Sequence, residues 1–373
     1  MSVPGDPFDE VVAELHAEAL ARAGTELDVF DAHTHLGQND PDGVKGTPEE
    51  ILAGLDRAAH RRALMFPMQE PGGYPPANDA ALTACEASGG RLLALGRVDP
   101  NTGDAAVAEA ERCFAAGAVG IKLHPRSDSF DLPHPIVERV VALAHEHRAP
   151  VLFPAGRGFP GLGEEVARLA ARYPGARMIL AHAGISDLGH LADVVAEAPN
   201  IFFDTSWWQV SDMLMLYTHV PPGRILYASD MPYGGARFSA TTDLRCAAQV
   251  GYGPDVLRSI FGEQTDRIVR GEEPLDLGPA PGPHGLGERD LAAERGIAYL
   301  ATACMVTFRG YDPTEPISLA RLALRDATGG FIAQADALAE RALEIVAEHP
   351  DNPRAAAYAI LGAQLVLGTP AAS

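Results

Sequence analysis

Residues 27–35 read LDVFDAHTH, a short apolar run that ends in polar and imidazole side chains. Seven further runs of this kind follow it along the chain. They are RRALMFP (61–67), RLLALGRVD (91–99), AVGIKLH (118–124), APVLFP (149–154), RMILAH (177–182), NIFFDT (200–205) and RILYASD (224–230). Near-continuous apolar runs are typical of strands covered on both faces, as in a parallel sheet, whereas half-exposed strands alternate apolar and polar residues.

Segments of helix-forming composition lie between most of these runs. Residues 47–50 (TPEE) combine a capping box with proline at the first helical position, which predicts a helix to about residue 59. Further helices are expected over 104–116, 135–147, 163–172 and 187–198. Eight strands that alternate with helices predict an α/β fold of the (β/α)8 TIM barrel type. A doubly wound open sheet is the competing architecture, but no glycine-rich phosphate turn follows the first run.

The predicted barrel, residues 27–273, occupies only part of the chain. Residues 1–26 form an N-terminal segment with one expected helix over 9–23, and residues 274–286 are rich in proline and glycine, as linkers are. Residues 287–373 predict an appended helical subdomain that packs on the barrel or on a second copy of the chain, giving a homo-oligomer. Its helices are expected over 287–308, 315–326, 331–348 and 353–367.

Composition restricts the partners and the compartment. The 373 residues include 50 acidic and 29 basic side chains, a net charge of −21, which argues against nucleic acid or an anionic membrane as the main partner. We therefore expect a small-molecule substrate. The 4 cysteines are widely spaced and suit a reducing, cytoplasmic compartment. We expect no secretory signal and no membrane segment, since the longest apolar run falls short of the ~20 residues that span a bilayer.

Polar side chains end several of the eight runs. In TIM barrels the catalytic groups lie at the C-terminal ends of the strands. The residues at these ends are His33 and His35 in the first run, Lys122 and His124 in the fourth, His182 in the sixth and Asp230 in the eighth. Residues two apart on a strand point to the same side, so His33 and His35 can face one centre. Two such imidazoles, a third histidine and a carboxylate suit a divalent transition metal, usually zinc.

Four motifs carry a resemblance to a known family. In chain order they are DAHTHLG (31–37), GIKLHP (120–125), ILAHAG (179–184) and YASDMP (227–232). Together with residues 78–101 they resemble the amidohydrolase superfamily, in particular the branch that contains aminocarboxymuconate-semialdehyde decarboxylase, and the likeness spans about residues 27–272.

The resemblance implies a distorted TIM barrel with one divalent metal ion, usually zinc, and a bound water. It implies that His33 and His35 are metal ligands, that His182 lies near the metal, and that Asp230 binds metal or moves protons. One residue departs from the family pattern, because Pro154 stands where a metal-binding histidine usually ends the fifth strand. Either His182 or His124 then completes the ligand set, or the enzyme works without metal, or the barrel has lost catalysis.

The first functional hypothesis is a hydrolase in which metal-activated water attacks a small, carboxylate-bearing carbonyl compound and Asp230 accepts the proton. Non-oxidative decarboxylation of an unsaturated or aromatic acid is the close alternative, and a non-catalytic scaffold subunit is the third.

Four further residues are candidates for substrate binding. Arg126 and Arg157 follow the fourth and fifth runs, where a guanidinium can bind a carboxylate through two hydrogen bonds, although surface arginines have the same signature. Lys122 is expected to face the substrate or pair with an acidic neighbour, and the wider superfamily suggests a carbamylated bridge between metals as an alternative. Trp207 follows the seventh run and either lines the pocket or packs in the core.

Overall fold

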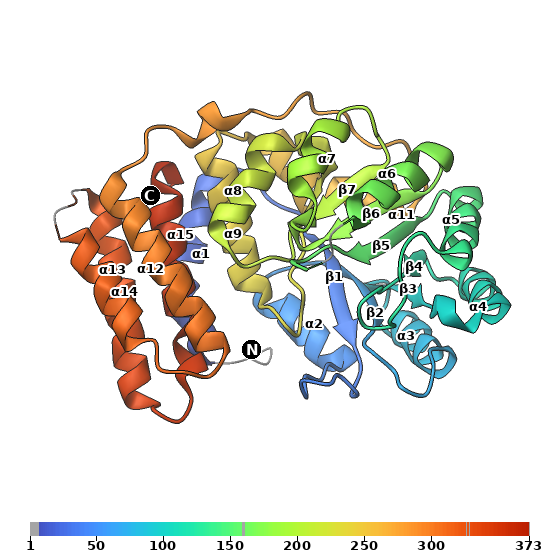
Figure 1. Cartoon of the computed structure of the whole chain (residues 1–373), viewed down its shortest axis with the longest axis horizontal. Coiled ribbons are helices and arrows are strands. Elements are labelled where there is room, and N and C mark those ends of the chain that lie inside the picture. The colour runs from blue at the N-terminus through green and yellow to red at the C-terminus, as the bar shows by residue number, and fades with distance from the viewer. Residues whose placement is uncertain (1–6, 159–160, 326, 328, 373) are drawn as a thin grey trace.

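The chain forms a closed ring of parallel strands surrounded by helices (Figure 1). The computed structural model describes residues 7–158, 161–325, 327 and 329–372. The eight strands form seven parallel pairs, in which each strand pairs with the next one along the chain. The strands are β1 (Phe30–Leu36), β2 (Arg62–Pro67), β3 (Leu92–Arg97), β4 (Gly120–Lys122), β5 (Pro150–Pro154), β6 (Arg177–Ala181), β7 (Ile201–Asp204) and β8 (Ile225–Leu226).

The segment around β8 returns to β1 and closes the ring. The Ala32 amide donates to the Tyr227 carbonyl at 2.9 Å, and the His35 amide donates to the Met231 carbonyl at 2.7 Å. The fold is therefore the predicted (β/α)8 TIM barrel and not an open sheet, which would leave two free edges. It is distorted, because β8 has only 2 residues and the pairing of β1 with β2 shifts register between Asp31 and Thr34.

Helices cover the outside of the barrel (Figure 1). They are α2 (Pro48–Arg57), α3 (Pro75–Ala87), α4 (Asp104–Ala115), α5 (Pro135–His147), α6 (Leu162–Arg172), α7 (Leu188–Val194), α8 (Val210–His219) and α9 (Ala236–Gln249), followed by α10 (Pro254–Arg258), a π-helical turn (Ser259–Glu263) and α11 (Gln264–Val269). The capping box of α2 is confirmed, since the Glu50 amide donates to Thr47 Oγ1 and the Thr47 amide donates to the Glu50 carboxylate. Helix α3 lay outside the helices that we expected from the sequence.

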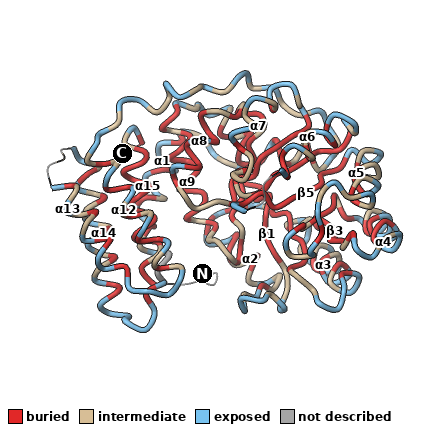
Figure 2. Tube along the Cα trace, in the orientation of Figure 1, coloured by how far each residue is buried: buried red, intermediate tan, exposed pale blue. Residues whose placement is uncertain are grey.

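Four more helices stand beside the barrel and bury a core of their own. They are α12 (Leu291–Phe308), α13 (Thr314–Leu324), α14 (Gly330–Glu348) and α15 (Ala357–Gly368), the last preceded by a 3-10 turn (Pro353–Ala356). Their core includes Val12 and Leu15, which come from the N-terminal helical segments Pro7–Val12 and α1 (Ala13–Ala23), and Phe238 of α9. Helix α15 is buried along almost its whole length, as Figure 2 shows.

The chain between α11 and α12 runs over the surface to reach these helices (Figure 1). Its only regular element within the described residues is a 3-10 turn, Pro283–Leu286. A buried hydrogen bond of 2.9 Å between Arg245 of α9 and Thr369, just after α15, fastens the C-terminal helices to the barrel. No helix in the described part of the chain is long and apolar enough to cross a membrane.

Candidate metal centre

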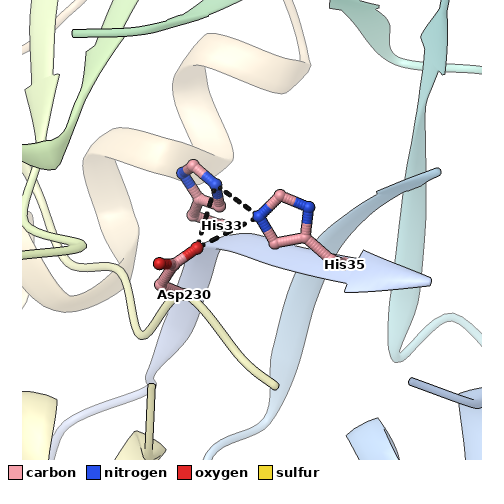
Figure 3. A group of neighbouring side chains, drawn as sticks. All are labelled: His33, His35 and Asp230. Atoms are coloured by element: carbon pink, nitrogen blue, oxygen red, sulfur yellow. Dashed lines mark hydrogen bonds and ion pairs between the residues drawn. The ribbon is translucent and has the colours of Figure 1, made fainter. Parts of the chain in front are cut away.

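Two histidines from β1 and an aspartate that follows β8 meet inside the mouth of the barrel (Figure 3). His35 Nε2 lies 3.0 Å from His33 Nε2 and 3.0 Å from Asp230 Oδ1, and His33 Nε2 lies 3.4 Å from the same oxygen. Possible ligand atoms of the three residues all lie within 4.8 Å of one another. Both imidazoles are buried and the carboxylate is partly exposed. We call these three residues the metal cluster.

The backbone around β1 and β8 holds the metal cluster together. Asp31 Oδ1 accepts hydrogen bonds from the amides of His33 (3.1 Å) and Ser229 (3.0 Å), and the Asp230 amide donates to the His33 carbonyl at 3.0 Å. Asp230 has φ +60° and His182 has φ +59°, a left-handed conformation that is uncommon outside glycine. Such strained residues gather at functional sites, where the surrounding contacts hold them in place.

Asp204, the last residue of β7, sets the protonation of His33. Its Oδ2 lies 2.8 Å from His33 Nδ1, so this nitrogen carries the proton and Nε2 presents its lone pair to the metal cluster. Burial alone raises the pKa of Asp204, but the charge and hydrogen bond of His33, together with His182 and the hydrogen bond of Ser206, lower that pKa to about 2. Asp204 is therefore an ionised, wholly buried carboxylate that orients a metal-binding imidazole.

The metal cluster has the donor set of a divalent metal site. Burial lowers the pKa of His33 to about 4 and that of His35 well below its ordinary value, so both imidazoles are neutral, the form that binds metal. The lone pair of His33 Nε2 faces a carboxylate oxygen, an arrangement that favours a cation between them. Catalytic zinc sites use three protein ligands and keep one position open. The three residues present thus fit such an ion.

His182 lies beside the metal cluster but outside the group of three. It follows β6, and its ring centroid is 5.3 Å from that of His33. Its Nδ1 is 2.9 Å from the Ser206 carbonyl oxygen, and its amide donates to Asp204 Oδ1 at 3.1 Å. The proton on Nδ1 leaves the lone pair on Nε2 available. Of the four residues expected to share one site, three form the cluster and His182 stands next to it.

The fourth and fifth strands contribute no side chain to the group of three. Lys122 is buried with Nζ 4.4 Å from the centroid of the Phe66 ring, and burial, reinforced by Arg97, lowers its pKa to about 7. His124 Nδ1 accepts the Ser127 amide at 3.1 Å, which uses one of its two nitrogens. Pro154 is the buried last residue of β5 and has no donor atom in its side chain.

A cavity of about 780 Å³ opens beside the metal cluster. Its wall includes Asp230 of the metal cluster, the neighbouring His182, and several aromatic and basic side chains. Those used below are His182, Trp207, Trp208, Asp230, Phe308, Arg126, Arg354 and Tyr358.

The two arginines expected to bind substrate differ in their surroundings. Arg126 lines the cavity. Arg157 donates instead to Asp212 at 2.6 Å, and the same carboxylate accepts from Trp207 Nε1 at 2.8 Å. Arg157 therefore supports the position of an indole in the cavity wall, and its expected contact with substrate stays a prediction.

Sequence reasoning missed two polar residues next to the cluster. Asp204 ends the seventh apolar run, so the rule that found Asp230 also applied to it. Ser206 donates through Oγ to Asp204 Oδ1 and accepts His182 through its carbonyl, and neither contact has a signal in the sequence.

Comparison with solved structures shows barrels of the same fold. A 2,6-dihydroxybenzoate decarboxylase from Rhizobium has a TM-score of 0.51 at 14% identity, over 66% of this chain and 99% of that one. A 5-carboxyvanillate decarboxylase from Sphingomonas paucimobilis has 0.51 at 16% identity, over 66% and 99%. A manganese-bound 5-carboxyvanillate decarboxylase from Novosphingobium aromaticivorans has 0.52 at 12% identity, over 65% and 97%. At these identities the likeness is one of fold.

No curated protein sequence matches the chain. A family model described as Amidohydrolase matches residues 30–268, which include all eight strands but none of the C-terminal helices α12 to α15. The match covers more than half of the chain and spans both histidines and the aspartate of the metal cluster. The chain therefore belongs to the amidohydrolase family.

Proposed function

We propose that the chain is a metal-dependent enzyme that removes carbon dioxide from a small aromatic or unsaturated carboxylic acid. The observation that carries this proposal is the metal cluster of His33, His35 and Asp230 beside a cavity with an aromatic wall. Flat aromatic side chains favour a flat apolar ligand, and a guanidinium such as that of Arg126 favours a carboxylate. Barrels of the same fold are described as decarboxylases of two aromatic acids, which supports this choice of substrate class.

The residues divide the work in the following way. A bound divalent ion would polarise the substrate's oxygen atoms. Asp204 keeps the His33 lone pair directed at the cluster, and His182 presents the lone pair of Nε2 to a substrate hydroxyl group or to the ion. The bond between the substrate carbon and its carboxylate breaks, and that carbon takes a proton in its place. Asp230 lies both in the cluster and in the cavity wall, so it is the carboxyl group suited to hold and deliver that proton.

Hydrolysis of a carbonyl compound is the second candidate. The matching family model is described as Amidohydrolase, and the same cluster suits water activation with Asp230 as the base. The three-ligand cluster disfavours the third hypothesis, a scaffold subunit without catalysis. We propose zinc as the ion, with manganese as the alternative because one of the solved decarboxylases contains it.

The test combines metal content with product analysis. Full-length protein purified without added metal should contain about one divalent ion per chain by elemental analysis. The double variant His33→Ala with His35→Ala should lose the ion, whereas His190→Ala, at an exposed histidine of α7, should keep it. Metal-loaded protein is then incubated with 2,6-dihydroxybenzoate and related hydroxybenzoates, and carbon dioxide is measured. Unchanged metal content in the double variant refutes the site, and metal-loaded protein that releases no carbon dioxide from any of these acids refutes decarboxylation of this substrate class.

A further inference from the structure

The C-terminal helices form one wall of the cavity, although they lie beyond the residues that the family model matches. The match ends at residue 268. Phe308 of α12, Arg354 of the 3-10 turn and Tyr358 of α15 nevertheless line the same cavity as Asp230 of the metal cluster. The site for a ligand is therefore composite, with the chemistry on the barrel and part of the wall on the added helices.

Close contacts between barrel and helices fix this wall in place. The ring of Trp208, which follows β7, lies 5.2 Å from that of Phe308 in an edge-to-face arrangement. The ring of Tyr358 lies 5.3 Å from that of Phe238 on α9. A Cβ atom at Gly235 would collide with the Tyr358 hydroxyl, so glycine at this position lets the tyrosine of α15 pack closely against the barrel. The wall is thus a packed interface and not a loose flap.

A continuous series of rings leads from the metal cluster to the added helices. The His182 centroid is 6.1 Å from that of Trp207, which is 5.8 Å from Trp208, which is 5.2 Å from Phe308. Such a series favours a ligand with an extended, flat apolar body that reaches from the barrel mouth toward the helices.

Two arginines, Arg126 and Arg354, line the cavity together with the carboxylates of Asp42 and Asp230. Within the described residues, Arg126 and Arg354 make no side-chain hydrogen bond or ion pair, whereas Arg157 is held by Asp212. Arg126 comes from the barrel loop after β4 and Arg354 from the added helices. The chain as a whole carries a charge of −21 and repels anions, so an anionic ligand needs local cations of this kind.

We propose that Arg354, with the aromatic wall of α12 and α15, forms a distal subsite that binds the second carboxylate of an extended aromatic dicarboxylic acid. The first carboxylate is held at the barrel mouth, and only this near end rests on the proposed function. The added helices then select the substrate by its length and by the charge at its far end. A monocarboxylic acid of the same skeleton lacks a partner for Arg354.

The experiment compares two acids of the same skeleton on the full-length chain. Biphenyl-4,4′-dicarboxylate and biphenyl-4-carboxylate are titrated by calorimetry, with and without added manganese. Fluorescence locates the ligand, because the chain has only 2 tryptophans and both line the cavity. We expect the diacid to bind about tenfold more tightly than the monoacid, as one charged hydrogen-bonded pair provides.

Three variants assign the preference to one side chain. Arg354→Gln should bind both acids equally, and Arg354→Lys should keep part of the preference, since it retains the charge without the planar fork. Arg295→Gln, at an exposed arginine of α12 that is not among the residues lining the cavity, should behave like the parent protein. Circular dichroism checks that each variant is folded.

Equal affinity for the two acids in the parent protein, or a diacid preference that survives Arg354→Gln, would overturn the distal subsite. The readout is binding and needs no turnover. A protein that prefers the diacid but releases no carbon dioxide from any acid refutes the proposed function alone, and one that decarboxylates without the preference refutes the subsite alone.

Discussion

Replacing Asp204 with asparagine should weaken metal binding without touching a metal ligand. Asp204 Oδ2 accepts from His33 Nδ1 at 2.8 Å, and Oδ1 accepts the amides of His182 and Ser206 at 3.1 Å each. Asparagine offers one acceptor oxygen and one NH2 group. If the oxygen keeps the two amides, the NH2 group faces His33 Nδ1 and drives the ring proton to Nε2, the atom that belongs to the metal cluster. If the side chain turns over, the NH2 group faces two backbone donors.

The size of the effect follows from this contact. Loss of a residue that orients a metal-binding histidine typically costs 10–100-fold in metal affinity, which is about 1.4–2.8 kcal/mol. Because Asp204 and His33 are wholly buried, the free energy of unfolding should also fall, by about 1–3 kcal/mol for the hydrogen bonds left unmade. Metal affinity and stability are therefore measured on the same preparation.

The assay is a competition titration of metal-stripped protein against a chelating indicator, with zinc and manganese in separate runs. The matched control is Asp243→Asn, because Asp243 is also fully buried but its carboxylate accepts from Tyr217 and Thr205 instead of an imidazole. Unchanged metal affinity in Asp204→Asn would refute the role of Asp204 in orienting His33. An equal loss in the control would show that the effect is one of general destabilisation.

Three further predictions concern stability and the cavity wall. Burial lowers the pKa of His60 to about 3, so as the pH falls below about 6.5 the unfolded chain binds a proton that the folded chain does not, and the folded state loses stability. His60→Phe should therefore reduce the loss of unfolding free energy between about pH 7 and pH 4.5 by about 2–3 kcal/mol, measured by urea unfolding. An unchanged pH profile contradicts this. Gly235→Ala should lower stability by about 1–3 kcal/mol, because its Cβ meets Tyr358; an unchanged Tm would contradict the close packing. Arg157→Gln breaks an exposed ion pair with Asp212 and should weaken binding of aromatic acids by less than about 1 kcal/mol with metal affinity unchanged; a loss of metal would place Arg157 in the metal site.

The barrel was predictable because its strands are buried on both faces. Each observed strand overlaps one of the eight apolar runs, and the main difference is at β8, which comprises only Ile225–Leu226 of the run 224–230. Strand β1 includes His33 and His35, which are buried although their side chains are polar. Helix α3 was missed because Pro75 and Pro76 resemble a helix breaker, although proline is favoured in the first helical turn.

The site was predictable only for residues whose position follows from the local sequence of a single strand. The spacing of His33 and His35 and the position of Asp230 depend on strand geometry, which the sequence encodes locally. The contact of Asp204 with His33 joins residues 171 positions apart, and the distal wall joins the barrel to helices that follow a linker. These arrangements depend on packing between distant segments, and no local pattern specifies them.

Pro154 stands where the family resemblance predicts a metal-binding histidine, and His33, His35 and Asp230 still offer three donor groups. Two imidazoles and a carboxylate suffice for a catalytic metal, and such a centre needs an open position for substrate. A site with one protein ligand fewer has more room for substrate oxygens around the ion. Holding a substrate there then depends more on the cavity, whose aromatic series ends at Phe308 of α12 and whose wall includes Arg354. Proline at position 154 and the wall from the added helices are therefore consistent with each other, because contacts at the far end of the substrate add to the affinity that the metal ion provides.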